Sequence, residues 1–292
     1  MGQQHHLLHT EESKMSTPGD KHFYTYGYSP TTVQRLARRT AARLASFFLP
    51  YLRAGMHMLD CGCGPGSITI GLADVVAPGE VVGIDIEPSQ ITLARTQAAQ
   101  RGLTNIRFEV GNVMQLPFPE ATFDAVFGSN ILMQFQDPLL VLTEVCRVVK
   151  PGGVVGFREL TFDGNLYEPP AGARHQYYAL LTRMMQHNGG EPFMGRRLGT
   201  WLCRAGFRRV TMAASYVSAG TPEEKQAVYE EQARLCEEGA WMEQAIALGW
   251  ISRDGREHLR TALRAEGVDP EAFSAVASCE VVGWKAGPTP EL

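Results

Sequence analysis

Residues 58–67 of this 292-residue chain read MLDCGCGPGS and contain the groups best suited to bind a small molecule. Glycines at a turn from a strand into a helix let a ligand approach backbone N–H groups that a Cβ atom would block. A second apolar segment, residues 81–86, ends near Asp85, where a carboxylate can accept hydrogen bonds from ribose hydroxyls. Together the two segments predict a site for a cofactor that contains adenosine. The glycines of the turn are Gly62, Gly64 and Gly66.

The spacing of these glycines distinguishes two kinds of cofactor. Dinucleotides are held by G-x-G-x-x-G, which places a pyrophosphate against the helix N-terminus. The pattern here is G-x-G-x-G, and Ser67 occupies the third glycine position of the dinucleotide fingerprint. Asp60, just before the turn, would repel a pyrophosphate but suits an ammonium group. A glycine-rich turn without a ligand is the structural alternative.

The elements that must position this turn alternate between strands and helices. Such alternation predicts a parallel, doubly wound sheet with right-handed crossovers. After Glu159 the alternation stops, and a mostly helical insertion is expected over residues 166–195. We expect strands at 57–61, 81–86, 106–110, 123–128, 154–158, 209–218 and 275–284, and helices at 32–48, 68–76, 88–101, 138–149, 195–205 and 222–265.

These elements divide the chain into seven segments. Residues 1–20 are polar, without an apolar signal-peptide core, and are expected to be a disordered tail, with Met15 as an alternative start. The other segments are an aromatic loop and helix acting as a lid (21–50), the cofactor-binding core (51–160), a helical insertion over the active site (161–195), a core helix and sixth strand (196–218), a second helical insertion (219–272), and a final strand and tail (273–292).

Five motifs in order resemble those of the class I methyltransferases that use S-adenosyl-L-methionine (SAM). The resemblance is strong over residues 39–159, weak elsewhere, and closest to the ubiquinone/menaquinone-biosynthesis-type (methyltransferase type 11-like) branch. It implies a Rossmann-like, doubly wound, seven-stranded, mostly parallel sheet with helical lid insertions. It also implies methyl transfer from SAM, with S-adenosyl-L-homocysteine as product. The motifs are residues 62–66, 83–88, 111–113 with 116–118, 123–126 and 147–153.

The resemblance also implies which residues contact SAM. Asp85 would bind the ribose hydroxyls and Ile86 would pack on adenine. Asn112 stands where the family usually has aspartate; its side-chain carbonyl can still accept from the adenine amine, with the Val113 N–H reaching the ring. Asn130 would contact the methionine moiety, with helix capping as its structural alternative. The methionine end would be held by Asp60, Gly62, Cys63, Gly64 and Gly66.

The residues that would meet the methyl acceptor are less sharply defined. Transfer from a sulfonium is an in-line displacement in which alignment of the reacting atoms dominates, and a general base is needed only for an acceptor protonated at neutral pH. The acceptor nucleophile is therefore left open as O, N or C. Candidates for positioning or base catalysis are Glu159, His175 and Tyr28, and candidates for the acceptor pocket are Tyr24, Tyr26, Tyr177 and Tyr178; Tyr177 also has the spacing of a core residue.

Composition narrows the function further. The aromatic and Met-rich insertion favours a small, apolar or aromatic acceptor. A net charge of −4 gives no general attraction to nucleic acid, and the six cysteines show no CxxC or metal-ligand spacing. We expect no metal, no membrane span and a cytoplasmic location; oligomeric state and acceptor identity are left open. The alternative function is a SAM-binding protein of the same fold that catalyses another reaction or acts as a non-catalytic binding module.

Overall fold

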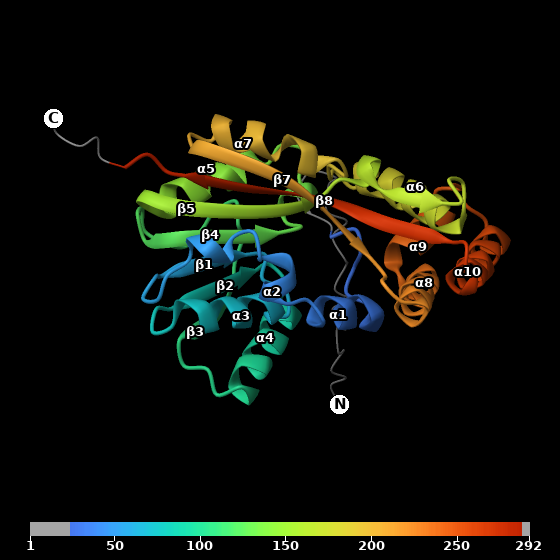
Figure 1. The fold of residues 1–292 in the computed structure, drawn as a ribbon, viewed down its shortest axis with the longest axis horizontal. Coiled ribbons are helices and arrows are strands. Elements are labelled where there is room, and N and C mark those ends of the chain that lie inside the picture. The colour runs from blue at the N-terminus through green and yellow to red at the C-terminus, as the bar shows by residue number, and fades with distance from the viewer. Residues whose placement is uncertain (1–23, 288–292) are drawn as a thin grey trace, which may run out of the picture.

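The computed structural model describes residues 24–287, and its centre is an eight-stranded mixed sheet (Figure 1). The expected tail at 1–20 and the two candidate start residues lie outside the described residues. Five neighbouring strands run parallel in the order β3-β2-β1-β4-β5, and β8 joins β5 antiparallel. The strands are β1 Met58–Cys61, β2 Val81–Asp85, β3 Ile106–Val110, β4 Phe123–Ser129, β5 Val149–Leu160, β6 Leu166–Glu168, β7 Arg208–Ser218 and β8 Phe273–Trp284.

The expected number of strands was one too few. Residues 166–168, assigned to a helical insertion, form β6, which pairs antiparallel with β8 from Phe273 to Ala275. A three-residue strand is too short to show a period in the sequence, and its pairing depends on a partner more than a hundred residues away. The long strand β8 pairs with β5 and β6 along one edge and with β7 along the other.

Two layers of helices cover the sheet because strand side chains alternate between its faces. In β1, Met58 joins a core cluster with α2 and α3, whereas Leu59 joins the cluster with α5 and α7 on the opposite face. Both faces of the central strand β1 are therefore buried, as βαβ connections require. The helices that cover these strands are α2 Ala41–Leu44, α3 Ser67–Val76, α4 Pro88–Gln100, α5 Leu139–Val148 and α7 Leu198–Arg204.

The single helix expected at 32–48 was wrong. The structure has α1 (Pro30–Ala37), which is capped by the Ser29 hydroxyl, and then α2, with Thr40 in an extended conformation between them. The two pieces pack on different partners, α1 on α8 and α2 on α3. Periodicity cannot reveal this break because both pieces have an apolar face.

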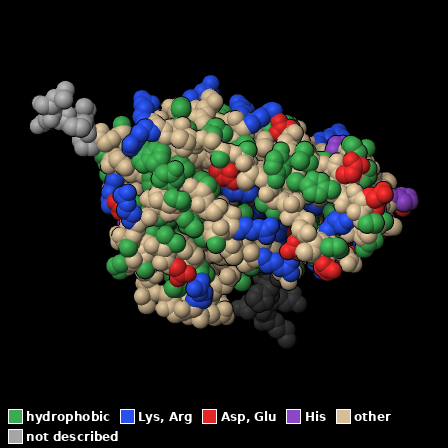
Figure 2. Space-filling model, viewed as in Figure 1, with side chains coloured by type: hydrophobic (Ala, Val, Ile, Leu, Met, Phe, Trp, Pro, Cys, Tyr) green, Lys and Arg blue, Asp and Glu red, His purple; other side chains and the backbone are tan. Residues whose placement is uncertain are grey.

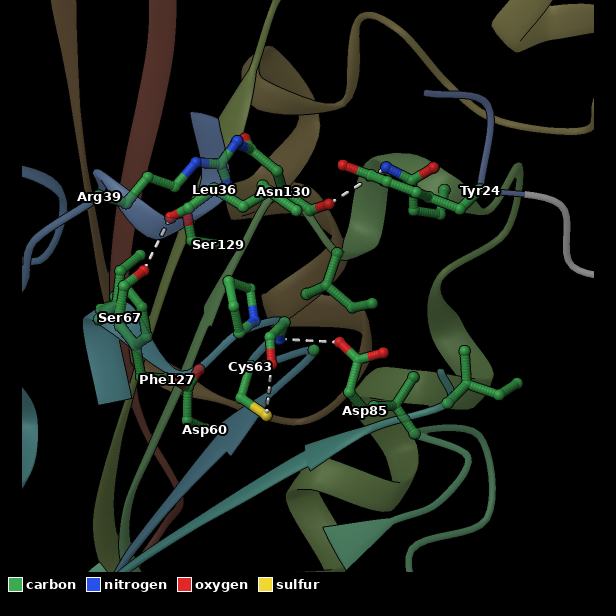
Figure 3. A pocket seen from close by; sticks show the side chains of 18 of the residues that line it. Tyr24, Leu36, Arg39, Asp60, Cys63, Ser67, Asp85, Phe127, Ser129 and Asn130 are labelled. Carbon is green, nitrogen blue, oxygen red and sulfur yellow. Dashed lines mark hydrogen bonds between the residues drawn. The ribbon is translucent and has the colours of Figure 1, made fainter. Parts of the chain in front are cut away.

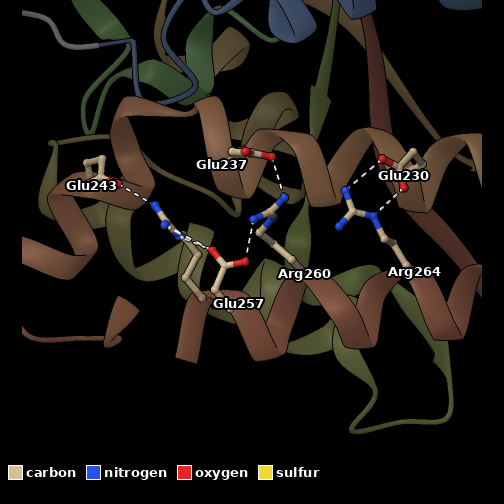
Figure 4. Close-up of polar contacts among 7 residues, drawn as sticks. Glu230, Glu237, Glu243, Glu257, Arg260 and Arg264 are labelled. Carbon is tan, nitrogen blue, oxygen red and sulfur yellow. Dashed lines mark hydrogen bonds and ion pairs between the residues drawn. The ribbon is translucent and has the colours of Figure 1, made fainter. Parts of the chain in front are cut away.

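Four helices gather at the far end of β8, away from the parallel strands (Figure 1). The charged segment expected as one helical unit at 222–265 is three helices, separated at Gly239 and at residues 248–252. Ion pairs join them on the outside: Arg264 with Glu230, and Arg260 with Glu237 (Figure 4). Exposed pairs each contribute at most about 1 kcal/mol. The buried aromatic side chains of these helices, Tyr177, Tyr229 and Trp241, contribute more through the area that they bury. The helices are α6 Ala173–His187, α8 Pro222–Glu238, α9 Ala240–Ala247 and α10 Arg253–Val268.

Candidate functional site

A cavity opens at the carboxyl ends of β1, β2 and β4 (Figure 3), where open α/β sheets bind ligands. Part of the cavity is open to solvent. Its walls come from the glycine turn, the ends of β2 and β4, the loop after β3, and the N-terminal segment around α1. The structure thus brings most of the expected cofactor residues together: Asp60, Gly62, Cys63, Gly64, Asp85, Ile86, Asn112, Val113 and Asn130 all line it.

Gly64 and Gly66 of the turn must be glycine for different structural reasons. All three glycines of the turn have positive φ (71°, 53° and 80° at Gly62, Gly64 and Gly66), a region that side chains disfavour. A Cβ added at Gly64 would meet no atom within 4 Å, whereas one at Gly66 would lie 2.7 Å from the Phe108 ring. Gly64 therefore faces the open cavity. Gly66, which does not line the cavity, is needed for close packing against β3 and α4.

Asp85 connects β2 to the glycine turn. Its Oδ2 accepts a hydrogen bond from the Gly64 N–H at 2.8 Å, and its Oδ1 accepts one from the Glu87 N–H at 3.0 Å. Burial raises the pKa of this carboxyl. Each carboxylate oxygen has a further lone pair, so the group can hold the turn and still accept from a ligand. Ile86 next to it is 54% exposed and forms an apolar edge of the cavity.

Asp60 is buried beneath the turn with one oxygen engaged. The Thr69 hydroxyl donates to Oδ2 at 2.6 Å, and no hydrogen bond to Oδ1 is found among residues 24–287. Burial, together with the charge of Asp85, raises the pKa of Asp60 to about 7. A cation placed against this carboxyl would relieve the cost of the buried charge. The arrangement therefore fits a positively charged ligand group.

Unpaired polar atoms mark the β4 side of the cavity. Asn130 adopts a positive φ of 57°, and its buried Oδ1 has no hydrogen-bond partner among the described residues, nor has the hydroxyl of Ser129. Such atoms are rare in folded proteins and call for a partner. Across the cavity, Asn112 Oδ1 already accepts from the Met114 N–H at 2.9 Å, which leaves its second lone pair and its amide N–H groups for a ligand.

Arg39 is a cavity residue that the sequence did not indicate. Its neighbourhood, residues 35–39, has the composition of a solvated basic helix face. The break between α1 and α2 instead brings the half-buried Arg39 to the cavity, on the same side as Ser129 and Asn130 (Figure 3). Burial lowers the pKa of Arg39. Within the described residues, no carboxylate lies within ion-pair distance of it.

The structure places Glu159 behind the cavity wall instead of in it. Its carboxylate accepts hydrogen bonds from three successive backbone N–H groups, those of Ile131 (3.0 Å), Leu132 (2.9 Å) and Met133 (3.1 Å). The side chain is fully buried, and burial raises its pKa to about 8. The end of β5 was the correct place to expect a carboxylate. Its geometry, however, is that of a positioning residue that fixes the loop after β4.

Two of the expected aromatic residues, Tyr24 and Tyr28, line the cavity with ring centroids 5.1 Å apart. Tyr26 is instead buried under the Arg35 guanidinium. No residue of 161–195 is among the lining residues, so the insertion does not contribute acceptor-pocket side chains here. His175 is exposed on α6, Tyr177 is buried against Trp241, and Tyr178 packs against Phe162.

The helical period explains these positions. Tyr177 lies on the inward face of α6, and His175 on the opposite face, where its ring is 5.5 Å from that of Tyr167. The lining residues that sequence reasoning missed come from the glycine turn and the start of α3, from β4 and the loop after it, from the loop after β3, and from the segment around α1. They are Leu36, Arg39, Pro65, Ser67, Ile68, Gly111, Phe127, Ser129, Ile131, Gln134 and Phe135.

Neither a metal-binding cluster nor a membrane-spanning helix is found in residues 24–287. No three His, Cys, Asp or Glu side chains are grouped so that they could hold a metal ion. None of the helices in this range has the length and apolar character needed to cross a bilayer.

The proteins to which this chain is similar support the interpretation of the cavity as a cofactor site. Residues 52–190 match the family model described as a methyltransferase domain. The chain is 34% identical over 197 residues to an uncharacterized methyltransferase of Schizosaccharomyces pombe, covering 64% of this chain and 69% of the relative. It is 37% identical over 123 residues to a demethylmenaquinone methyltransferase of Geobacillus, covering 38% of this chain but only 53% of that relative.

A solved structure shows the same fold. The [4+2]-cyclase SpnF aligns with a TM-score of 0.53 and 21% identity, over 88% of this chain and 81% of that one. The ordered motifs, the cavity beside the glycine turn and the relatives agree. The chain belongs to the class I SAM-dependent methyltransferases.

Proposed function

We propose that the protein transfers the methyl group of SAM to a small, neutral, largely apolar or aromatic acceptor. One observation carries this proposal: the described lining of the cavity contains three charged side chains, those of Arg39, Asp60 and Asp85. Each of these three side chains can be matched with a group of SAM that has a complementary charge or hydrogen-bonding capacity. The charged groups of the cavity are then assigned to the cofactor, and none is left for the acceptor.

The assignment follows from charge and from hydrogen-bonding capacity. In the part of the chain that the structure describes, Asp60 Oδ1 is free and suits the ammonium group, and Arg39 has no carboxylate partner and suits the carboxylate. Asp85 suits the two ribose hydroxyls, and Ile86 offers an apolar surface to adenine. The unpaired Asn130 Oδ1 is available to the methionine moiety. When bound, SAM supplies an activated methyl group on a sulfonium.

The remaining lining is uncharged. A charged acceptor would lose hydration here without gaining an opposite charge, which is costly in a partly buried site. An apolar or aromatic acceptor would instead gain contact area against rings and aliphatic side chains. The larger side chains of this group are Tyr24, Tyr28, Leu36, Phe127, Ile131 and Phe135.

The chain's own contribution to the reaction is alignment. Glu159 fixes the loop from Ile131 to Met133 through three backbone hydrogen bonds, and Asp85 fixes the turn at Gly64. Rigid walls on both sides hold two molecules in one orientation, which raises their effective concentration. Tyr24 and Tyr28 close the cavity on the N-terminal side and reduce access of water.

A second candidate is a reaction on the same scaffold that leaves the methyl group on SAM. The structural likeness to SpnF, whose name describes it as a [4+2]-cyclase, covers most of this chain. At 21% identity this likeness concerns the fold alone. A non-catalytic binding role is the third candidate, and the test below distinguishes all three.

The test uses SAM labelled in its methyl group and pairs of acceptors that differ only in charge. Each neutral phenol, quinol or indole is paired with its carboxylated analogue, and both S-adenosylhomocysteine and labelled product are measured. We expect turnover with neutral members and a marked loss with the carboxylated ones. Preference for the carboxylated members would contradict the charge assignment. Product formed without label transfer would favour the second candidate, and SAM binding without any product would favour the third.

We also infer a small-molecule acceptor instead of a nucleic acid, and a cytoplasmic location. The net charge is −4, and acidic side chains stand among the basic ones on the face in Figure 2, which does not favour a polyanion. The six cysteines are all free, as in a reducing compartment.

A further inference from the structure

Among the described residues, the strand β7 has a pairing partner along only one of its two edges. On one side it pairs with β8 from Arg208 to Ser218. Within residues 24–287, the backbone of 210–218 makes no hydrogen bond to any element other than β8. In Figure 1, β7 lies at the edge of the sheet opposite β3. The strand therefore presents a row of free N–H and C=O groups to solvent.

Most of this edge has none of the features that usually protect one. Natural edge strands carry charges, prolines or bulges that prevent pairing with other chains. Here a bulge and Arg209, with a φ of 49°, protect only the beginning of β7. Residues 210–218 contain no charge and no proline, and Met212 and Tyr216 are 46% and 53% exposed. A nine-residue segment is thus open to strand addition.

We propose that this edge pairs with β7 of a second copy of the chain, antiparallel and centred on Ala214, so that the two sheets become continuous. A two-fold axis at Ala214 places the small exposed alanines of the two copies opposite each other. Met212 of each copy then faces Tyr216 of the other on the same side of the sheet. A thioether beside an aromatic ring is a favourable cross-strand contact.

Charge at the two ends of β7 supports a second copy as the occupant. The beginning of the strand carries Arg208 and Arg209, and the segment just after its end carries Glu223 and Glu224. Antiparallel pairing brings the basic end of one copy to the acidic end of the other, twice in each dimer. A closed, self-complementary contact of this kind is the usual form of a two-fold dimer.

The test exploits the residue at the two-fold axis. Wild type, Ala214→Lys and Ala214→Glu are compared by sedimentation over a concentration series. We expect a wild-type dimer, and a dimer dissociation constant raised about ten-fold or more in each variant, because like charges directly opposite are destabilising. An equimolar mixture of the two variants should restore a dimer that contains one copy of each. This restoration is expected only if Ala214 of one copy lies opposite Ala214 of the other.

A matched control is Leu140→Lys, since Leu140 is 66% exposed on α5 and lies off the edge; this variant should dimerise as wild type does. SAM affinity serves as the folding check, because β7 contributes no residue to the cavity lining. A monomeric wild type at all concentrations would overturn the proposal, as would a variant mixture that stays monomeric while both variants bind SAM. Pairing of this edge only with an extended segment of another protein would overturn it as well.

Discussion

The carboxylate of Asp85 accepts a hydrogen bond from the backbone N–H of Gly64 at 2.8 Å, which joins the end of β2 to the turn after β1. The two residues are 21 positions apart, and each was expected in the cofactor site for a separate reason. Their contact makes the site one unit: the residue assigned to ribose also holds the turn assigned to methionine. A change at Asp85 should therefore affect both ends of the cofactor site.

Asp85→Ala should weaken SAM binding about ten-fold to one hundred-fold, since losing a charge-assisted partner costs roughly 1.5–3 kcal/mol. Calorimetry with SAM measures this directly. Asp74→Ala is the matched control, because Asp74 is an exposed carboxylate on α3 that pairs with Arg101. NADH should show no comparable binding to wild type. Unchanged SAM affinity in Asp85→Ala would remove this residue from the site.

Gly64→Val should abolish SAM binding while the protein stays folded. Gly64 and Gly102 both have positive φ, and a Cβ at either would meet no atom within 4 Å. Valine at either position should therefore carry a similar backbone strain of about 1–2 kcal/mol. Gly64, unlike Gly102, lines the cavity, so Gly102→Val should bind SAM normally. Equal SAM affinity in the two variants, measured by calorimetry, would show that the turn has only a structural role and does not contact SAM.

Arg39→Ala should weaken SAM about ten-fold or more because the carboxylate loses a charge-assisted partner. The sharper measurement uses decarboxylated SAM, whose affinity should be the same for wild type and Arg39→Ala. Arg38→Ala is the control, since its neighbouring guanidinium is 60% exposed and lies 3.8 Å from Glu231. An equal loss for both ligands would show that Arg39 supports the fold of the N-terminal segment instead.

SAM binding should weaken as pH falls below about 7, the pKa to which burial raises Asp60. In the free protein the carboxyl is protonated below this pH, whereas the bound ammonium group favours the ionised form, so binding must release a proton. Affinity then rises with pH by up to about ten-fold per unit and levels off above the pKa. Calorimetry at pH 6 in buffers of different ionisation enthalpy counts the proton.

Two variants control this pH dependence. Asp60→Asn should remove it, since no carboxyl is left to titrate. Thr69→Ala should move its midpoint to higher pH, because the Thr69 hydroxyl bonds to Asp60 and lowers its pKa. If the midpoint of the pH dependence of SAM affinity were the same in both variants as in wild type, a group other than Asp60 would be responsible for it.

The part of the site that the sequence predicted is local in the chain. The turn at Gly62 and Gly64 and the carboxylate of Asp85 follow from a strand, a turn and a helix within thirty residues. Arg39 was missed because its position depends on α1 and α2 packing on two separate helices. For Glu159 the strand end was predicted correctly, but the direction of the side chain depends on the backbone N–H groups of the loop after β4.

Prediction of the fold was likewise limited to features that are local in the chain. Four of the five parallel strands were predicted to within one residue at each end. The fifth, β5, begins at Val149, five residues before its predicted start, because residues 150–153 (KPGG) have the composition of a turn but continue the strand. The strand β6 exists only through its pairing with β8. His175 and Tyr177 were grouped together because both lie in one aromatic-rich segment, yet the helical period sends them to opposite faces of α6.

The last prediction concerns the two tyrosines that close the cavity. Tyr28 lies near Asp85, whose charge adds to burial in raising the Tyr28 pKa, whereas the Tyr24 ring packs against the rings of Tyr26 and Tyr28. Tyr28→Ala should therefore weaken both SAM binding and turnover. Tyr24→Ala should lower kcat/KM for the acceptor about ten-fold or more while SAM affinity changes little, because its ring excludes water and orients the acceptor.

Tyr51→Ala provides the control for these two variants, since Tyr51 is 38% exposed and packs edge-on against Trp284 at 5.3 Å, away from the cavity lining. It should leave both SAM affinity and turnover unchanged. Steady-state kinetics with an accepted neutral phenol or quinol, together with calorimetry for SAM, separates the two effects. Full turnover in Tyr24→Ala would show that this ring is ordinary packing, and the acceptor would then have to be oriented by the loop after β4, where Glu159 holds the backbone of Ile131 in place.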